Sequence, residues 1–386
     1  MCLLFKRKEE LMLRIAFLIN SLGGGGAERV LTDLVNHMDK TKFDVTIITM
    51  FGAGVNVQFL NNNIHHISRN SLKIKGLSKF IKYISPDWLY HHYFGQDNYD
   101  ILVAFLHGAP TRAVWGAPDK IPKIAWFHSQ MEHSSFSRYY KNKDELIECC
   151  KAFNKLICVS NSVCESLTRL TGINEDIITI YNTIDTNRIL KLSREPIVPN
   201  NTPDNVVRIV SLGRLAKEKG YVRLTDAVKK MVEDRLRFVI DILGSGPEET
   251  NIRENIRCKG LGGYIRILGF KENPYPYMIN ADIYLCCSFE EGLNTAMCEA
   301  LVLGRPVIST NVSGAYEILG KNNEYGIVAE NSTEAIYYNL KQMVESPELL
   351  ERYRKNAAVR GMMFNRKETV KSVETMFLDV YNSRNI

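Results

Sequence analysis

Arg14-Ile-Ala-Phe-Leu-Ile-Asn20 is an apolar run with the length of a buried strand. Gly23-Gly-Gly-Gly26 follows it, and from Ala27 to Met38 the apolar residues recur at helical spacing. A strand, a glycine-rich turn and a helix in this order predict the start of an α/β domain. Glycines at a helix N-terminus let a phosphate or a sugar approach the backbone N–H groups, although a plain flexible turn would have the same sequence. The turn is not the dinucleotide-binding fingerprint, because Arg29 stands where that pattern requires a glycine.

Strand-like runs and helix-like stretches alternate through the first half of the chain. Ser160 is expected to cap a helix that ends near Gly172. Further strands are predicted at residues 43–50, 101–106, 121–127 and 155–159. Because these runs are apolar throughout and are separated by helices, they predict a parallel sheet with helices on both of its faces.

The pattern starts again after a break. Residues 192–205 include three prolines and show no periodicity, which predicts a linker. Beyond it we expect strands at 206–212, 237–243, 265–268, 282–286 and 306–310, and helices at 217–233, 293–303 and within 333–381. The sequence therefore predicts two α/β domains, residues 1–191 and residues 192–366 with the linker included. The last helix, about residues 367–386, is expected to pack back on the first domain.

Composition limits the class of protein. The chain has 386 residues, of which 45% are hydrophobic and 24% are charged, as in a soluble globular protein. Its longest apolar run, residues 101–106, is far shorter than the roughly 20 residues of a membrane-spanning helix. The N-terminus lacks the pattern of an export signal. Nine cysteines without a C-x-x-C pair predict reduced, buried thiols of a cytosolic protein.

Charge is unevenly distributed along the chain. The net charge is +6, and residues 1–195 contribute +5 of it. A basic first half suggests an anionic partner, although a chance distribution of charged residues along the chain could produce an excess of this size. The stretch from Ser71 to Tyr93 interleaves Lys73, Lys75, Lys79 and Lys82 with apolar and aromatic residues. It predicts a basic amphipathic helix at a membrane surface, the alternative being a surface helix packed on the core. No nucleic-acid-binding motif accompanies it.

Two cations follow the first strand of the second domain, in Gly213-Arg-Leu-Ala-Lys-Glu-Lys-Gly220. Ligands of open α/β sheets bind beyond the carboxyl ends of the strands. There Arg214 could donate two hydrogen bonds to phosphate oxygens and Lys219 could add a point charge, which would suit a pyrophosphate. Ordinary solvated side chains are the alternative. Gly244-Ser-Gly246 is a weaker candidate of the same kind.

An acidic pair follows the strand that ends near residue 286. Glu291 stands in the loop, and Glu299 lies two turns into the next helix. The backbone N–H groups of residues 292–295 could form an anion site at the start of that helix. Alternatively, Glu291 caps the helix and Glu299 is solvated. The apolar neighbours of Glu299 argue against a solvated face.

Taken in order, these motifs resemble the family-4 retaining glycosyltransferases of the GT-B fold. The resemblance rests on Gly-Gly-Gly-Ala-Glu-Arg, Gly-Arg-Leu-x4-Gly, Leu-Gly-Ser-Gly-Pro-Glu, Leu-Gly-Phe, the pair Glu291/Glu299 and Gly-Arg-Pro-Val-Ile-Ser-Thr, all within residues 13–330. Each motif is weak alone, and the ordered set is specific. It implies two doubly wound Rossmann-like domains that face each other across a cleft, and it implies sugar transfer.

The resemblance also implies residue roles. Arg214 and Lys219 would hold the donor diphosphate, Glu291 the hydroxyls of the donor sugar, and Glu299 the ribose hydroxyls. His128 resembles the family's histidine beside the anomeric carbon, and His107 is the less favoured competitor. The remaining positions implied to bind substrate are Gly25, Gly26, Asn182, Gly292, Leu293, Asn294 and Thr295.

The chain departs from the family at three points. Glu291-Gly-Leu-Asn-Thr-Ala296 stands where the family often has Glu-Gly-Phe-Gly-Leu-Pro, which leaves the donor hexose open. Thr183 replaces a glycine after Asn182, in a loop that lies between the domains in the family. The chain also lacks a D-x-D pair, so we expect no metal and no other cofactor, with Arg214 and Lys219 neutralising the diphosphate.

The function expected from the resemblance is the retaining transfer of a hexosyl or N-acetylhexosaminyl unit. The donor would be a nucleotide sugar, first of all a UDP sugar, and the acceptor a glycan or lipid-linked molecule in capsule or lipopolysaccharide synthesis. We expect a cytoplasmic protein in reversible contact with the inner membrane surface. A nucleotide-sugar epimerase and a non-catalytic sugar-nucleotide binder are the rival functions. Same-face attack and double displacement both remain open as the route to retention.

Overall fold

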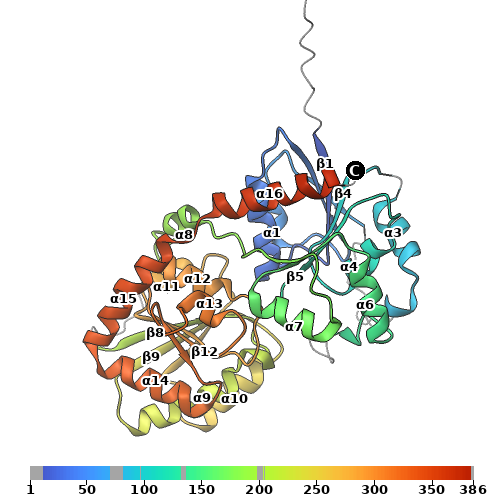
Figure 1. The fold of residues 1–386 in the computed structure, drawn as a ribbon. Helices are drawn as coiled ribbons and strands as arrows, with labels where there is room; N and C mark the ends of the chain where they lie inside the picture. The colour runs from blue at the N-terminus through green and yellow to red at the C-terminus, as the bar shows by residue number, and fades with distance from the viewer. Residues whose placement is uncertain are drawn as a thin grey trace, which may run out of the picture. The chain divides into compact units, whose positions relative to one another are not determined.

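The computed structural model describes residues 12–69, 81–95, 97–131, 136–197, 203 and 205–383. The chain divides into two compact units (Figure 1). Unit 1 consists of residues 1–183 and 367–386, and unit 2 of residues 184–366. Each unit contains one parallel sheet of its own.

Unit 1 is built on a seven-stranded sheet of order β3-β2-β1-β4-β5-β6-β7. All of its neighbouring strands pair in parallel. Its elements are β1 (Leu13–Ile19), α1 (Gly26–His37), β2 (Phe43–Thr49), the 3-10 helix η1 (Val55–Phe59), β3 (His65–Ser68), the 3-10 helix η2 (Ile81–Tyr83), α3 (Pro86–Phe94), β4 (Ile101–Ala104), α4 (Ala109–Trp115), β5 (Lys123–Phe127), α6 (Lys143–Lys151), β6 (Lys155–Cys158), α7 (Asn161–Thr171) and β7 (Ile177–Thr179).

Unit 2 repeats this plan with a six-stranded parallel sheet of order β10-β9-β8-β11-β12-β13. Its elements are α8 (Thr186–Leu192), β8 (Val207–Leu212), the 3-10 helix η3 (Lys217–Lys219), α9 (Tyr221–Glu233), β9 (Phe238–Leu243), α10 (Glu249–Cys258), β10 (Ile265–Gly269), α11 (Tyr275–Ile279), β11 (Ile283–Cys286), α12 (Thr295–Val302), β12 (Val307–Thr310), α13 (Ala315–Leu319), β13 (Ile327–Ala329), α14 (Thr333–Glu345) and α15 (Pro347–Met362).

Both faces of the second sheet are buried, as the uninterrupted apolar runs predict. Successive residues of a strand point to opposite faces. Along β11, Ile283 and Leu285 join the core that contains residues of α9, α10 and α14. Tyr284 and Cys286 join the core that contains residues of α11, α12 and α13. The prediction of doubly wound α/β units is confirmed for both halves of the chain.

The last helix, α16 (Arg366–Ser383), belongs almost entirely to unit 1 (Figure 1). Phe377 is fully buried, and its ring packs edge-on against Phe17 of β1 and Phe43 of β2, with centroid distances of 5.9 and 6.2 Å. The backbone N–H of Asp39 donates a 2.6 Å hydrogen bond to Glu374. The C-terminal helix thus completes the core of a unit whose other elements come from the first half of the chain.

The structure differs from the expected elements at several points. The helix predicted over 217–233 is interrupted at Gly220, whose φ of +71° ends η3 before α9 begins. The strands β3 and β7 were not predicted, because they are short and only partly buried. The strand β13 was not predicted because it is only three residues long. Of the cysteines that the structure describes, none forms a disulfide and six are buried, whereas Cys258 is exposed.

The continuous amphipathic helix predicted over 71–93 is wrong for the part that the structure describes. Lys73, Lys75 and Lys79 lie outside the described residues. After η2, the side chain of Ser85 caps a separate helix, α3, by accepting a hydrogen bond from the Trp88 N–H. Tyr83 and Trp88 are exposed. Among the described helices, none combines the length and the apolar character needed to cross a membrane.

Phe377→Ala should destabilise unit 1, because it removes a fully buried ring from a packed cluster. We expect a loss of about 3–5 kcal/mol in the free energy of unfolding. All three tryptophans lie in unit 1, so urea unfolding followed by tryptophan fluorescence reports on this unit. The exposed Lys371 of the same helix provides the control, and Lys371→Ala should change the stability by no more than about 0.5 kcal/mol. Equal effects of the two substitutions would contradict the packing role.

Candidate active site

The candidate site of unit 2 lies where the strand order reverses. The strands β8 and β11 are neighbours, and from them the sheet grows in opposite directions. Ligands of open α/β sheets bind at such a switch point, beyond the carboxyl ends of the strands. The segments 213–220 and 287–294 follow β8 and β11 there, and they carry the cations and the carboxylate singled out in the sequence.

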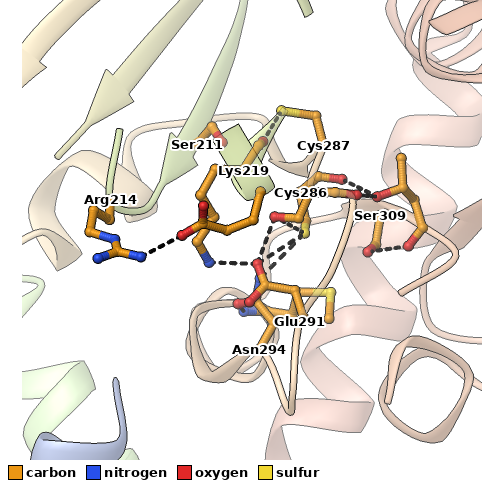
Figure 2. A network of polar contacts seen from close by, with 12 residues as sticks. Ser211, Arg214, Lys219, Cys286, Cys287, Glu291, Asn294 and Ser309 are labelled. Carbon is orange, nitrogen blue, oxygen red and sulfur yellow. Dashed lines mark hydrogen bonds and ion pairs between the residues drawn. The ribbon is translucent and has the colours of Figure 1, made fainter. Parts of the chain in front are cut away.

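Lys219 and Glu291 form an ion pair that joins these two segments (Figure 2). The Lys219 Nζ lies 2.7 Å from Oε1 of Glu291, and the two side chains are only 20% and 11% exposed. The same oxygen accepts hydrogen bonds from the Ser288 hydroxyl at 2.6 Å and from the Asn294 amide at 3.1 Å. No residue in the described part of the chain donates to Oε2. The carboxylate is therefore fixed through one oxygen, while the other can accept from a ligand.

Arg214 is also paired with a carboxylate. Its Nη2 lies 2.5 Å from Oε1 of Glu218, one turn further along (Figure 2). Burial works to raise the pKa of Glu218, but the hydrogen bond and the charge of Arg214 outweigh it and lower the pKa. The Arg214 side chain is 68% exposed, and an ion pair this exposed contributes little to stability. A diphosphate could thus take Glu218's place on Arg214 at small cost.

Two glycines allow the loops at this edge to approach one another. A Cβ on Gly220 would lie 2.1 Å from the carbonyl oxygen of Cys287, after β11. A Cβ on Gly244, at φ +149°, would lie 1.9 Å from the carbonyl oxygen of Gly213, after β8. No side chain fits at either position, so the weaker motif Gly244-Ser-Gly246 has at least a packing role.

Arg223 of α9 holds the loop that follows β11 and carries Glu291, and this arginine was not singled out from the sequence. Its guanidinium donates to the carbonyl oxygens of Cys287 and Ser288, each at 2.8 Å, and to that of Asn331 at 3.3 Å. It also lies over the Phe289 ring, 3.8 Å from the centroid. No sequence signal marked this residue, because an arginine on an amphipathic helix is usually solvated. Arg223 is only 9% exposed, so here the arginine is buried and its guanidinium is occupied by the contacts to the loop.

The structure contradicts both alternative roles of the acidic pair. The cap of α12 is Asn294, whose Oδ1 accepts from the Met297 N–H at 3.1 Å, and not Glu291. Glu299 is 8% exposed and accepts a 3.2 Å hydrogen bond from the Tyr275 hydroxyl, so it is not on a solvated face. Gly292, Leu293 and Thr295 lie half-buried around the start of α12, where a ligand could approach their backbone.

In unit 1, unpartnered polar atoms gather beyond the carboxyl ends of the strands. Each atom is buried and has no hydrogen-bond partner in the structure, which is rare without a ligand or an ordered water. The atoms follow β1, β4, β5 and β7, and they are Asn20 Oδ1, His107 Nδ1, His128 Nε2 and Asn182 Oδ1. Asn20 was not among the predicted site residues, although its place directly after the first strand was a signal. Gly25 and Gly26 lie exposed at the start of α1.

The two candidate histidines lie close together. Burial lowers the pKa of His107 to about 4. Burial and the neighbouring charge of His107 lower the pKa of His128 to about 3. The His128 ring packs against Phe105 with a centroid distance of 4.7 Å, and His107 Nε2 lies 3.5 Å from the Ser129 hydroxyl. Because both pKa values lie well below 7, both imidazoles are neutral at pH 7. The choice of His128 over His107 as the residue beside the anomeric carbon remains a prediction.

Two family models match the chain. The model described as Glycosyltransferase Family 4 matches residues 24–188, and the model described as Glycosyl transferases group 1 matches residues 194–360. Two Rossmann-like units with a charged site at the strand ends define the GT-B class of sugar transferases. The chain belongs to the family-4 glycosyltransferases, and the predicted family, the two doubly wound α/β units and the glycosyltransferase activity are confirmed. Retention of configuration and independence of metal stay predictions.

Relatives and solved structures cover nearly the whole chain. The N-acetylgalactosamine-N,N'-diacetylbacillosaminyl-diphospho-undecaprenol 4-alpha-N-acetylgalactosaminyltransferase of Campylobacter jejuni is 27% identical over 379 residues, covering 92% of this chain and 96% of that protein. The lipopolysaccharide core biosynthesis glycosyltransferase LpsE of Rhizobium meliloti is 22% identical, covering 85% and 88%. Anabaena HepE in complex with UDP and glucose is a similar structure, with a TM-score of 0.74, 17% identity and coverage of 95% and 100%.

The buried histidines should make the stability of unit 1 depend on pH. Their pKa values are about 4 and about 3 in the folded chain, against 6.5 as the ordinary value. The unfolded chain then binds more protons below pH 6.5, so stability is fully present above pH 6.5 and falls as the pH drops toward 4. His107→Gln combined with His128→Gln should flatten this dependence, as measured by urea unfolding at several pH values. The exposed His92 is the control, and His92→Gln should retain the slope. An unchanged slope in the double variant would contradict the buried, neutral state.

Proposed function

We propose that this glycosyltransferase moves a hexosyl or N-acetylhexosaminyl unit, with retention of configuration, from a UDP sugar to a glycan or lipid-linked acceptor of a surface polysaccharide. The observation that carries the proposal is the Lys219–Glu291 pair beside Arg214 at the switch point of unit 2. The names of relatives support a lipid-linked or lipopolysaccharide acceptor. The UDP in HepE complexes supports the choice of base.

The chemistry of the leaving group explains why cations belong at this edge. Breaking the bond to the sugar leaves charge on a nucleoside diphosphate, and fixed positive groups stabilise that charge. Arg214 and Lys219 would do so without a metal ion. Glu291 would accept hydrogen bonds from donor-sugar hydroxyls through its unoccupied Oε2. Glu299, buried in α12, would hold the ribose, and the backbone of residues 292–295 would meet the sugar and the phosphate.

Unit 1 would contribute the groups that face the anomeric carbon and the acceptor. His128 is the proposed residue beside the anomeric carbon, because its unpartnered Nε2 can exchange a hydrogen bond with a hydroxyl while the ring stays neutral. Asn182 offers an unpartnered amide oxygen in the same way. Gly25 and Gly26 leave the start of α1 open to phosphate or acceptor.

We also propose that the protein works at the cytoplasmic face of the membrane in reversible contact with it. The excess of positive charge in residues 1–195 supports attraction to anionic lipids. The exposed rings of Tyr83 and Trp88, next to Lys82, are suited to the lipid headgroup region.

The proposed function is tested by incubating the protein with labelled UDP sugars, with and without a lipid-linked glycan acceptor. Each product should appear only with the acceptor, keep the anomeric configuration of the donor, and form equally in excess chelator. Activity that is lost in chelator and restored by Mn²⁺ would contradict the metal-free mechanism. Isomerised donor without transfer would favour the epimerase, and binding without any product would favour the sugar-nucleotide binder.

Arg214 and Glu299 should affect different kinetic constants. Arg214 faces charge that develops during the reaction, so Arg214→Ala should lower kcat by about 100- to 1000-fold. Glu299 would hold a ribose that does not change, so Glu299→Gln should raise KM for the donor and largely spare kcat. Steady-state kinetics measure both effects, and Arg257→Ala, at an exposed ion pair of α10, is the matched control. An effect of Arg214→Ala on KM alone, or loss of kcat in Glu299→Gln, would show that the roles are assigned wrongly.

A further inference from the structure

Asn294 makes three contacts with a single side chain. Its Oδ1 accepts from the Met297 N–H at 3.1 Å and so caps α12. Its Nδ2 donates to Oε1 of Glu291 at 3.1 Å and lies 3.3 Å from the Cys286 sulfur (Figure 2). The residue is 7% exposed. Both ends of the amide are therefore engaged, one by the helix and the other by the candidate catalytic carboxylate.

The residue type at this position is specific to this double role. Ser, Thr and Asp also cap helices well. A capping Ser uses its short hydroxyl on the backbone, and an Asp would place a second carboxylate about 3 Å from Glu291, where like charges repel. The Glu-Gly-Phe-Gly-Leu-Pro pattern has a glycine here, which has no side chain to offer. Asn294 combines an acceptor for the helix with a donor for Glu291.

The consequence is a fixed orientation of the Glu291 carboxylate. Lys219, Ser288 and Asn294 all bond Oε1, from three different backbone positions. The carboxylate cannot rotate about its bond to the side chain without losing these contacts. Oε2 is thereby directed away from the cluster and remains available to a ligand.

We infer that Asn294 is a positioning residue for sugar transfer, which holds Oε1 of Glu291 so that Oε2 accepts a hydrogen bond from a hydroxyl of the donor hexose. This inference rests on the proposed function for the identity of the ligand. The capping of α12 makes the arrangement rigid, because the same side chain is anchored to the helix backbone.

The groups around Glu291 allow a test by pH. The titratable groups that face it are Lys219 of η3, Tyr221 of α9, and Tyr284 and Cys286 of β11. Burial raises the pKa of both tyrosines and of Cys286 above their ordinary values. These three groups therefore keep their protons between pH 5 and pH 8. A carboxylate introduced at position 294 would be an added titratable group beside the Glu291 carboxylate.

Asn294→Asp keeps the helix cap and replaces the amide donor by a carboxylate. At pH 8 we expect kcat to fall about 10- to 100-fold, the size of effect expected when a reacting group is misplaced by about 1 Å. Lowering the pH to 5 should bring the ratio of variant to wild-type kcat back toward one. The reason is that two adjacent carboxylates share a proton, and the introduced side chain, once protonated, can donate to Glu291.

Asn294→Ser is the matched control, since it keeps a capping oxygen and adds no charge. It should lose kcat at pH 8 as well, but with a ratio to wild type that does not change with pH. Asn294→Ser should bind UDP alone within about twofold of wild type, because it adds no charge and keeps the backbone N–H groups at the start of α12. A merely structural residue would instead change UDP binding and melting temperature in Asn294→Ser, and Asn294→Asp would show no recovery at low pH.

One readout does not depend on donor or activity. The melting temperature of Asn294→Asp, relative to wild type, should be lower at pH 8 than at pH 5, since the repulsion between the carboxylates disappears on protonation. A difference that does not vary with pH would overturn the contact between Asn294 and Glu291. The inference is supported if the wild type transfers sugar and the lowered kcat of Asn294→Asp recovers at low pH. Wild-type transfer combined with unaltered Asn294→Asp kinetics would overturn it, whereas a wild type inactive with every donor would refute the proposed function instead.

Discussion

The ion pair between Lys219 and Glu291 is the interaction on which the candidate site of unit 2 depends. It joins the segment after β8 to the segment after β11, the two strands at which the sheet reverses its order. A carboxylate that is 11% exposed needs compensation, and Lys219, Ser288 and Asn294 supply it through one oxygen. At this edge of the sheet, a ligand can bind to Oε2 of Glu291 and to the positive charge of Arg214.

Packing behind the site makes this arrangement possible. Gly220 lets the turn before α9 touch the carbonyl of Cys287, and Arg223 binds that carbonyl and the next one. These contacts are local consequences of a doubly wound sheet, in which helices on both faces place successive loops at one edge. The family match adds what geometry alone does not specify, namely that the transferred group is a sugar.

The sequence predicted most of the fold because its strands are short, uninterrupted apolar runs between amphipathic helices. It failed where that signal is weak, as in β3, β7 and β13, and where one glycine divides a helical pattern, as at Gly220. At the candidate site, Arg214, Lys219 and Glu291 were singled out because they lie in loops that directly follow buried strands, and Glu299 because its neighbours in the sequence are apolar. Arg223 was missed because it binds the carbonyl groups of a loop at least 64 residues away, which no sequence pattern marks. Asn20 was missed although it directly follows the first strand. The hydrogen bonds of Ser288 and Asn294 to Glu291 depend on the conformation of the loop after β11, which the sequence does not specify. The residue roles implied by the family resemblance remain predictions.

We expect Glu291 to present Oε2 to the donor sugar while Oε1 stays bound to Lys219, Ser288 and Asn294. A crystal structure of the protein with a non-transferable UDP-hexose analogue tests it most directly. The sugar should place a hydroxyl within hydrogen-bond distance of Glu291 Oε2, and the diphosphate should lie beside Arg214 and Lys219. The contacts of Ser288 and Asn294 to Oε1 should be retained. An analogue bound away from the ends of β8 and β11, or a Glu291 carboxylate turned away from the sugar, would contradict it.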